Sequence, residues 1–191
     1  MRRSMILTLL LFSLSVPATG QGKLAPRTGT LLVATTQLAD TRFQQSVILI
    51  TRHNRAGTSG LVLNRPLGKL PSDLGGSLQT RPQGIFWGGP VAPLQVRALL
   101  LDNQQAAGKV LAEGLHLLNA DELNAILHKT PLESGELRTY LGYAGWAPRQ
   151  LAFEIARGDW LVLPVNAATL QQLNPEQMWR TLAPRSEANW I

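Results

Sequence analysis

Residues 30 to 63 read TLLVATTQLADTRFQQSVILITRHNRAGTSGLVL, and this stretch decides the character of the fold. It contains three short apolar segments rich in leucine, valine and isoleucine, at Thr30 to Thr35, Ser46 to Thr51 and Leu61 to Leu63. Short apolar runs bounded by polar residues predict buried strands. The polar segment Arg52 to Gly60 contains two glycines and predicts a hairpin-type loop between the second and third strands. The domain therefore begins as a β-rich unit.

Downstream of this unit, predicted strands alternate with short helices. Strands are predicted at residues 85–87, 96–101, 114–118, 136–143 and 160–164, and helices near 120–129, 148–156 and 175–182. Asn119 and Glu122 have the spacing of a capping box, and Pro148 and Pro175 suit the first helical position of the two later helices. This order predicts one compact α+β or mixed α/β domain around a largely antiparallel sheet, with a few short helices. The Gly-, Pro- and Ser-rich segment Leu67 to Gln83 is predicted to be irregular.

The first twenty residues have the three-part pattern of a bacterial secretory signal peptide. Arg2 and Arg3 are positively charged, Met5 to Val16 is apolar, and Pro17 to Gly20 offers small residues to a peptidase. The apolar run of about 12 residues is shorter than the ~20 that a membrane-spanning helix needs. We therefore expect residues 1–20 to be a cleaved signal peptide, 21–28 a short polar lead-in and 29–191 one domain in the periplasm or outside the cell. The alternatives are an uncleaved anchor and a misassigned start codon.

The composition excludes several classes of chemistry. The chain has no cysteine, so disulfides, thiolate catalysis and cysteine-bound metals are excluded. Its net charge of +6 is modest, arises mostly from arginine, and is interpreted as a solvated basic face with no nucleic-acid partner. Between residues 41 and 72 there are cations and no acid, a pattern that would attract anions if these residues shared one face: Arg42, Arg52, Arg55, Arg65 and Lys69. No pair of the three histidines has metal-ligand spacing, and no metal, cofactor or membrane span after cleavage is expected.

Two glycine-containing motifs suggest possible binding loops. Residues 57–66 read GTSGLVLNRP, in which Ser59 is followed directly by glycine, so the spacing is wrong for the G-x-S-x-G motif of hydrolases. Asn64 and Arg65 precede a proline and predict a structural turn, with the rim of an anion site as the alternative. Gly88 and Gly89 predict close strand packing, or a backbone nest for an anion.

A third motif joins a strand to a helix. Residues 140–151 read YLGYAGWAPRQL and carry no charge before Arg149, and Glu154 lies one helical turn beyond Gln150. The short turn would aim the helix N-terminus past the strand end, and Trp146, Gln150 and Glu154 would then line a concave pocket. The alternative is a packed corner, in which Glu154 caps or pairs with a neighbour.

Taken together, these motifs resemble the YqgE/AlgH family in order and spacing. The resemblance covers about residues 29 to 182 and rests on Gly29–Ala34, Asp40, Phe43, Ser46–Val47, His53, Gly60–Pro66, Gly88–Val91, Gly142–Trp146, Gln150–Leu151, Glu154, Trp160 and Trp179. It implies a compact α/β domain around a strongly curved β-sheet, in a family labelled as regulatory, with no known cofactor and no established reaction. The chain departs from the family in its signal-like N-terminus, and in having Arg149 where glycine is usual.

The leading functional hypothesis is a non-enzymatic periplasmic protein that binds a small anionic ligand or a protein partner. Its pocket would combine the loop at Asn64 and Arg65, the loop at Gly88 and Gly89, and the corner from Trp146 to Glu154, with no catalytic residue assigned. One alternative is a hydrolase that uses Glu154, or His53, with Asn64. The other is a cytosolic regulator whose start codon is misassigned.

The signal-peptide prediction is tested directly at the N-terminus. Protein purified from its host should begin between Thr19 and Gly22, because small residues at this point suit signal peptidase. N-terminal sequencing is the measurement, and recovery of intact Met1 from the soluble cytosol would contradict the prediction.

Overall fold

A computed structural model describes residues 24–67, 84–104, 107–128 and 135–183. The predicted signal peptide, residues 21–23 of the predicted lead-in and nearly all of the predicted irregular segment at 67–83 lie outside these ranges. No helix in the described part of the chain is long and apolar enough to cross a membrane.

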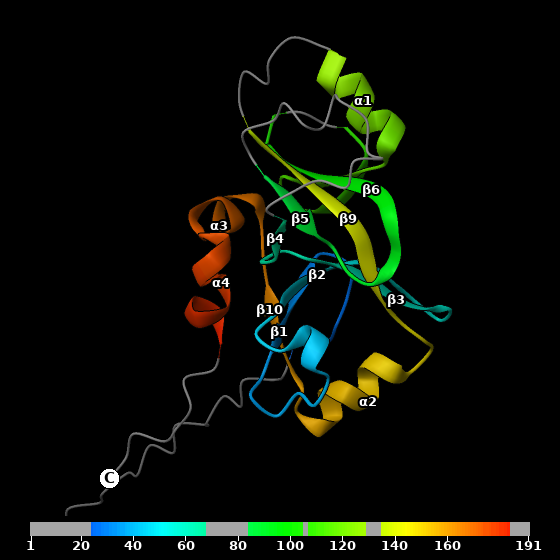
Figure 1. Ribbon diagram of the computed structural model, residues 1–191, viewed down its shortest axis with the longest axis vertical. Coiled ribbons are helices and arrows are strands. Elements are labelled where there is room, and N and C mark those ends of the chain that lie inside the picture. Colours follow the sequence, from blue (N-terminus) through cyan, green and yellow to red (C-terminus); the bar gives the residue numbers. More distant parts are fainter. Residues whose placement is uncertain (1–23, 68–83, 105–106, 129–134, 184–191) are drawn as a thin grey trace, which may run out of the picture.

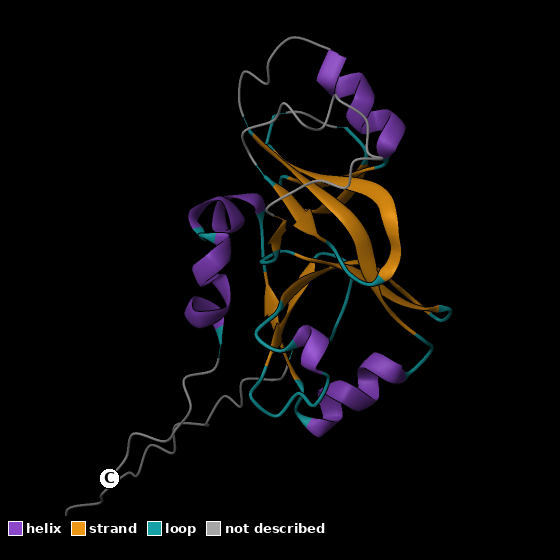
Figure 2. Cartoon of the chain, in the orientation of Figure 1, coloured by secondary structure: helices purple, strands orange, loops and turns teal. Residues whose placement is uncertain are grey.

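The structure is dominated by strands, with a few short helices at its periphery (Figure 2). The strands are β1 (Thr30–Ala34), β2 (Val47–Asn54), β3 (Gly57–Val62), β4 (Pro66–Leu67), β5 (Ile85–Trp87), β6 (Val91–Leu101), β7 (Lys109–Ala112), β8 (Leu115–Leu118), β9 (Glu136–Trp146) and β10 (Trp160–Pro164). The helices are the 3₁₀ turn η1 (Thr41–Phe43), α1 (Ala120–His128), α2 (Gln150–Arg157), α3 (Ala167–Gln172) and α4 (Pro175–Leu182).

The strands form one curled, largely antiparallel sheet, a half-barrel, in the order β10-β1-β2-β3-β9-β6-β8-β7 (Figure 1). β5 pairs with β9 in parallel and with β4 in antiparallel orientation. The curl brings β7, at one end of this order, back toward β2. There Lys109 Nζ on β7 donates a hydrogen bond to the carbonyl of Thr51 on β2 at 2.9 Å. The expected curved antiparallel sheet is therefore present, within a fold that is more sheet-dominated than a mixed α/β domain.

Both faces of the central strands are buried, which explains their continuous apolar sequences. In β1, Leu31 and Val33 belong to one core cluster, whereas Leu32 and Ala34 belong to another on the opposite face. The first cluster includes Met178 of α4, and the second includes residues of η1 and α2. A third cluster packs α1 against β6 and β8. The short helices thus cover the two faces of the sheet.

Local capping signals position the helices. Asn119 accepts a hydrogen bond from the amide of Glu122, whose carboxylate accepts one from the amide of Asn119, so the predicted capping box is confirmed. Asn174 caps α4, and Pro175 occupies its first position as predicted. Pro148 instead lies in the turn before α2, which begins at Gln150. The helix prediction there started too early because the turn continues through Arg149, whose φ of 67° is left-handed.

Several strands differ from the prediction. β3 begins at Gly57, so most of the expected 52–60 loop belongs to a hairpin whose turn is only residues 55–56. β9 continues to Trp146 instead of ending at 143, and β4, β7 and α3 were not predicted. Gly57 and Ser59 carry little intrinsic strand preference, unlike Thr58, but the pairing of β3 with both β2 and β9 buries all three residues.

β9 is shared by the two halves of the sheet, and glycines make the junction possible. Its C-terminal end pairs with β3, while its N-terminal part pairs with β5 and β6. Gly88 lies at the point where these pairings meet, accepting from the amide of Val62 at 2.9 Å and donating to the carbonyl of Leu141 at 2.7 Å. A Cβ on Gly89 would lie 2.1 Å from the Tyr143 carbonyl carbon, and one on Gly142 would lie 2.4 Å from the Gly89 oxygen. Gly88 and Gly89 are thus explained by close strand packing.

Alanine substitutions should distinguish the glycines at this junction, where two backbone segments touch, from a glycine that has room for a side chain. Gly89→Ala and Gly142→Ala should each lower the free energy of unfolding by at least about 3 kcal/mol, because backbone contacts and positive φ angles both exclude a Cβ. Gly145→Ala is the matched control on the same strand, since its Cβ would meet nothing closer than 3.4 Å. Chemical denaturation measures all three. Equal stability of the three variants would contradict the packing argument.

Candidate functional site

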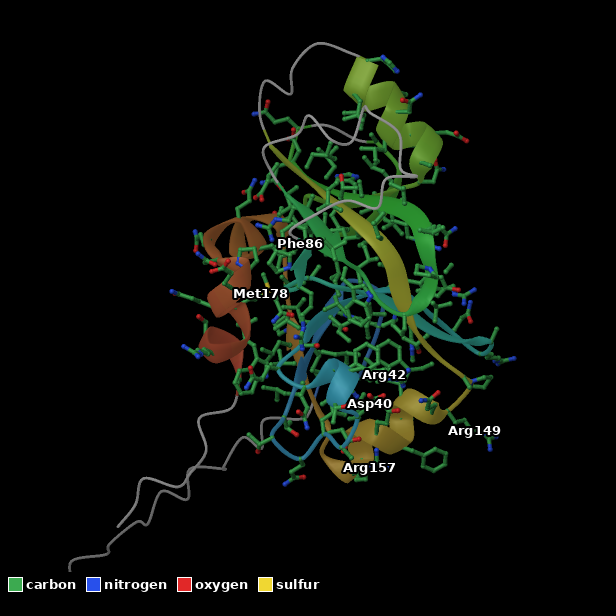
Figure 3. All side chains as sticks on the ribbon, viewed as in Figure 1. Asp40, Arg42, Phe86, Arg149, Arg157 and Met178 are labelled. Atoms are coloured by element: carbon green, nitrogen blue, oxygen red, sulfur yellow. The ribbon has the colours of Figure 1, made fainter. Side chains whose placement is uncertain are left out.

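A small pocket of about 180 Å³ lies at the corner where β9 turns into α2, hereafter the Glu154 pocket. Its polar lining comes from η1 and α2 and their flanks: Asp40, Arg42, Gln150, Glu154 and Arg157. Its other lining residues are apolar or small: Leu38, Phe43, Pro90, Val91, Gly145, Trp146 and Trp160. Figure 3 labels Asp40 and Arg42 beside η1 and Arg157 on α2, the two elements that flank the pocket.

Glu154 connects three elements through its carboxylate. Its Oε2 accepts hydrogen bonds from the indole nitrogens of Trp146 and Trp160, both at 2.8 Å. Its Oε1 accepts one from the side-chain amide of Gln150 at 2.9 Å. Glu154 is half-buried and Gln150 is exposed. Three neutral donors therefore hold this carboxylate where β9 ends, α2 begins and β10 begins.

The turn before α2 is fixed by its own hydrogen bonds. The side-chain oxygen of Gln150 accepts from the amide of Ala147 at 3.0 Å, which satisfies a donor ahead of the helix. At the other end, Gly158 takes a left-handed conformation and its amide bonds the carbonyls of the last turn. Gln150 and Glu154 project from one side of α2 because they are four residues apart. The predicted grouping of Trp146, Gln150 and Glu154 is thus present, as both a hydrogen-bonded corner and the wall of a pocket.

Aromatic rings form the apolar walls. The ring of Phe43 stacks on that of Trp146 with centroids 6.4 Å apart, and Trp146 meets Trp160 edge to face at 6.0 Å. Trp87 contacts Phe43 from β5 at 6.1 Å. Such arrangements hold rings rigidly, because the positive edge of one ring meets the negative face of another. The two indole N–H groups are consequently aimed at Glu154.

Two arginines flank the pocket, and each is paired with an aspartate. Arg42 binds Asp40 at 2.7 Å, and Arg157 pairs with Asp159, which is itself almost fully buried. The hydrogen bond from Arg42 lowers the pKa of Asp40 below its usual value, so this pair persists until the pH falls below the ordinary range of an aspartate. The hydrogen bond to Asp159 raises the pKa of Arg157. The charges of the rim are thus largely balanced.

Asn64 and Arg65 line a different pocket of about 530 Å³, together with residues of α4 such as Trp179 and Arg180. Asn64 accepts from the amide of Val47 at 2.9 Å and donates to the carbonyl of Gln45 at 2.8 Å. Its role in this structure is to tie a turn to the start of β2. The structure therefore separates these two residues from the Glu154 pocket, and the predicted single pocket is divided in two.

The glycine loop contributes to the Glu154 pocket only through its end. Pro90 and Val91 line the pocket, whereas Gly88 and Gly89 pack against β9. The amide of Gly88 is used within the sheet and does not face an anion.

The residues of the hydrolase hypothesis do not meet in one cleft. His53 is exposed on β2 and its Nδ1 lies 2.7 Å from the Thr58 hydroxyl. Asn64 and Glu154 line separate pockets. Among the described residues, no group of three or more acidic, His or Cys side chains could hold a metal ion.

Several pocket residues were not predicted from the sequence. Asp40, Arg42 and Phe43 reach the pocket from η1, and Arg157 and Trp160 complete it from the end of α2 and from β10. Arg157 lies three residues after Glu154 on α2, so helical spacing could have suggested it. The η1 residues are distant in sequence. The five cations between residues 41 and 72 do not gather at one site, since Arg42 and Arg65 line different pockets and Lys69 lies outside the described ranges.

Comparison with known proteins finds members of one family that match most of the chain. The model of the family described as AlgH-like matches residues 31–190. A UPF0301 protein of Myxococcus xanthus is 37% identical over 158 residues, which cover 79% of this chain and 86% of that protein. A UPF0301 protein of Mycobacterium leprae is 39% identical over 148 residues, covering 72% of this chain and 71% of that protein.

Two solved structures have the same fold. A crystal structure of a Corynebacterium diphtheriae protein gives a TM-score of 0.68 at 29% identity, covering 82% of this chain and 85% of that one. The solution structure of the AlgH protein from Pseudomonas aeruginosa gives a TM-score of 0.62 at 30% identity, covering 81% and 85%.

Removing the carboxylate of Glu154 should destabilise the protein. Glu154→Ala leaves two buried indole donors without an acceptor and should lower the free energy of unfolding by about 2–4 kcal/mol. Glu154→Gln keeps an acceptor oxygen and should cost less than half as much. Glu176→Ala, at an exposed position on α4, is the control and should change stability by under about 0.5 kcal/mol. Denaturant titration followed by tryptophan fluorescence would report all three, and a neutral Glu154→Ala would refute the structural role.

Proposed function

The chain belongs to the AlgH-like family, and we propose that it is a non-catalytic binding protein whose ligand site is the Glu154 pocket. The observation that carries this proposal is the composition of the pocket. Two guanidinium groups and rigid aromatic walls surround a space in which the half-buried carboxylate of Glu154 already has its hydrogen bonds. Pockets that combine apolar walls with a few placed polar groups are typical of small-molecule sites.

Binding is favoured over catalysis by the side chains that face the space. The described lining contains no Ser, Thr, His, Lys or Tyr, and its two carboxylates are Asp40 and Glu154. Asp40 is engaged by Arg42, and Glu154 is engaged by two indoles and Gln150. A general base needs a free lone pair directed at the proton it removes. The pocket is therefore better suited to hold a ligand than to activate a nucleophile.

The proposed ligand is a small molecule that carries a carboxylate or phosphate. Arg42 uses its Nε and Nη2 atoms on Asp40, and Arg157 uses the same two atoms on Asp159, so each retains its Nη1 donors. The aspartates orient the guanidinium groups, which leaves these donors available to an incoming anion. The volume of about 180 Å³ is smaller than the range for drug-sized ligands, ~300–1,000 Å³, and this favours a compact molecule.

The proposal includes export to the periplasm. Its support is the N-terminal pattern of Arg2, Arg3 and the apolar run Met5 to Val16. A binding protein in that compartment would meet small anionic metabolites that diffuse through the outer membrane.

Indole resonances give a direct test of the ligand site. Titration with acetate, succinate or inorganic phosphate should shift the indole N–H signals of Trp146 and Trp160, because an anion at Arg42 and Arg157 changes the field at Glu154. The Trp179 indole should not move, since it donates to the carbonyl of Ala34 outside the pocket. Heteronuclear NMR, with assignments from single Trp→Phe variants, is the measurement.

Variants of the two rim arginines complete this test. Arg42→Gln and Arg157→Gln should each weaken binding of the anion that shifts the indole signals by about tenfold or more. A loss of this size is usual when a hydrogen bond to a charged group is removed. Arg27→Gln removes an exposed cation outside the pocket and should leave the affinity unchanged within about twofold. The proposed function fails if no anion of the series moves the two indole signals, or if all three arginine variants behave alike.

A further inference from the structure

The outward side of α2 carries an unusual exposed stripe. Phe153 is 69% exposed, the largest exposed fraction among the large apolar side chains of the described residues. Arg149 precedes it by four residues and Ala152 and Ala156 flank it, and all three are exposed. The other large apolar residues of α2, Leu151 and Ile155, pack into the core. Phe153 thus has no packing role that accounts for it.

The β2–β3 hairpin extends this stripe with further cations. Arg52 and Arg55 are exposed on the hairpin. Thr58 pairs with Trp146, and a Cβ on Gly57 would lie 2.5 Å from the Trp146 carbonyl, so the hairpin tip adjoins the turn that leads to Arg149. Figure 1 shows the tip projecting from the body on the side of this turn. We call Arg52, Arg55, Arg149 and Phe153 the basic end.

The positive charge of the basic end is not compensated locally. Within the described residues, ion pairs are formed by Arg42, Arg138 and Arg157, and by none of the three arginines of the basic end. Glu154, the acid nearest to Phe153 in sequence, is turned toward the two indoles. Three unpaired guanidinium groups and one exposed aromatic ring therefore share one end of the molecule.

The backbone at Arg149 points to the same surface. Arg149 has a φ of 67°, a left-handed conformation that is strained for a residue with a Cβ and unstrained for glycine. Its side chain makes no cap hydrogen bond to the helix. The long cationic side chain is thus held on a strained backbone without a hydrogen bond or ion pair in the described structure that would compensate for the strain.

We propose that the basic end docks on an anionic phospholipid surface. Guanidinium groups bind phosphates through parallel hydrogen bonds, and the negative charge of such a surface attracts clustered arginines. Phe153 would insert at the boundary between headgroups and acyl chains, as aromatic side chains do in interfacial helices. This inference does not depend on ligand binding in the Glu154 pocket, whose helical residues Gln150, Glu154 and Arg157 lie on the adjoining face of α2.

A lipid surface fits better than an acidic protein. The stripe has one large apolar side chain, flanked by alanines and arginines. Shallow insertion needs little more than one aromatic ring beside cations, whereas a protein interface of ordinary size buries a broader apolar centre. A second copy of the chain would present the same positive charge and be repelled at this end.

The absence of cysteine allows a clean site-specific probe. Ala152→Cys, labelled with an environment-sensitive fluorophore, places the reporter beside an intact Phe153. Its emission should shift to the blue with phosphatidylcholine vesicles that contain phosphatidylglycerol, and not with phosphatidylcholine alone. Added salt should weaken the binding, because it screens the arginines. The same label at Val110→Cys, an exposed position on β7, should not respond.

Matched variants separate specific docking from the general attraction of a basic protein. Arg55→Gln and Arg149→Gln should each weaken vesicle binding about fivefold, and Phe153→Ser about tenfold. Arg180→Gln on α4 and Val110→Ser remove the same groups elsewhere and should each change it by less than about twofold. Circular dichroism and thermal denaturation would confirm that each variant is folded.

The outcomes are decisive in either direction. Failure to bind vesicles containing phosphatidylglycerol would overturn the lipid proposal and leave the stripe to an acidic protein partner. Equal losses in test and control variants would overturn it as well, since they would show attraction by net charge alone. Binding that survives Phe153→Ser undiminished would exclude the insertion of that side chain.

Discussion

Two backbone segments touch where residues 88–89 cross residues 141–143, and the remaining architecture depends on this contact. Gly88 joins the end of β3 to the middle of β9 by bonding both Val62 and Leu141. A side chain at Gly89 or Gly142 would occupy space already filled by the opposite backbone. Because the crossing lets β9 belong to both halves of the sheet, the sheet can curl without losing its hydrogen-bond ladder.

The functional corner follows from that curl. β9 delivers Trp146 to the place where β10 begins with Trp160, and one carboxylate on α2 accepts from both indoles. A carboxylate held by three neutral donors is first a structural element, since its removal would orphan buried donors. The part of the pocket that remains free for ligand chemistry is its rim, at Arg42 and Arg157. Glu154 therefore organises the site that the arginines are proposed to use.

The fold also divides the arginines of the described structure into those that form ion pairs and those that do not. Some arginines are paired, including Arg138, which lies buried on β9 against Glu136 and donates to the carbonyl of Leu170 in α3 at 3.0 Å. Burial, the largest single cause, would lower the pKa of Arg138, but the hydrogen bonds and charge interactions with Glu136 and Tyr140 together outweigh it, and the pKa is raised. Others, such as Arg55 and Arg149, have no ion-pair partner in the described structure. A net charge counted from composition does not distinguish these two groups, although only the second carries positive charge that no carboxylate of the described structure balances.

The sequence by itself determined the features that depend on neighbours within a few residues. The apolar segments at Thr30–Thr35 and Ser46–Thr51 predicted buried strands, the caps at Asn119 and Asn174 marked helix starts, and helical spacing brought Gln150 beside Glu154. Each of these signals acts through local sterics or a local hydrogen bond, so each is readable without the fold.

Only the tertiary structure decided which distant segments meet. It buried Gly57 to Ser59 in a strand, drew Asp40 and Arg42 to the Glu154 pocket, and moved Asn64 and Arg65 to another. Asn64 could equally have faced a ligand, because an amide that bonds a backbone has the same sequence signature as one that binds an anion. The choice between them is made by long-range strand pairing, whose partners lie too far apart in sequence for any local pattern to specify.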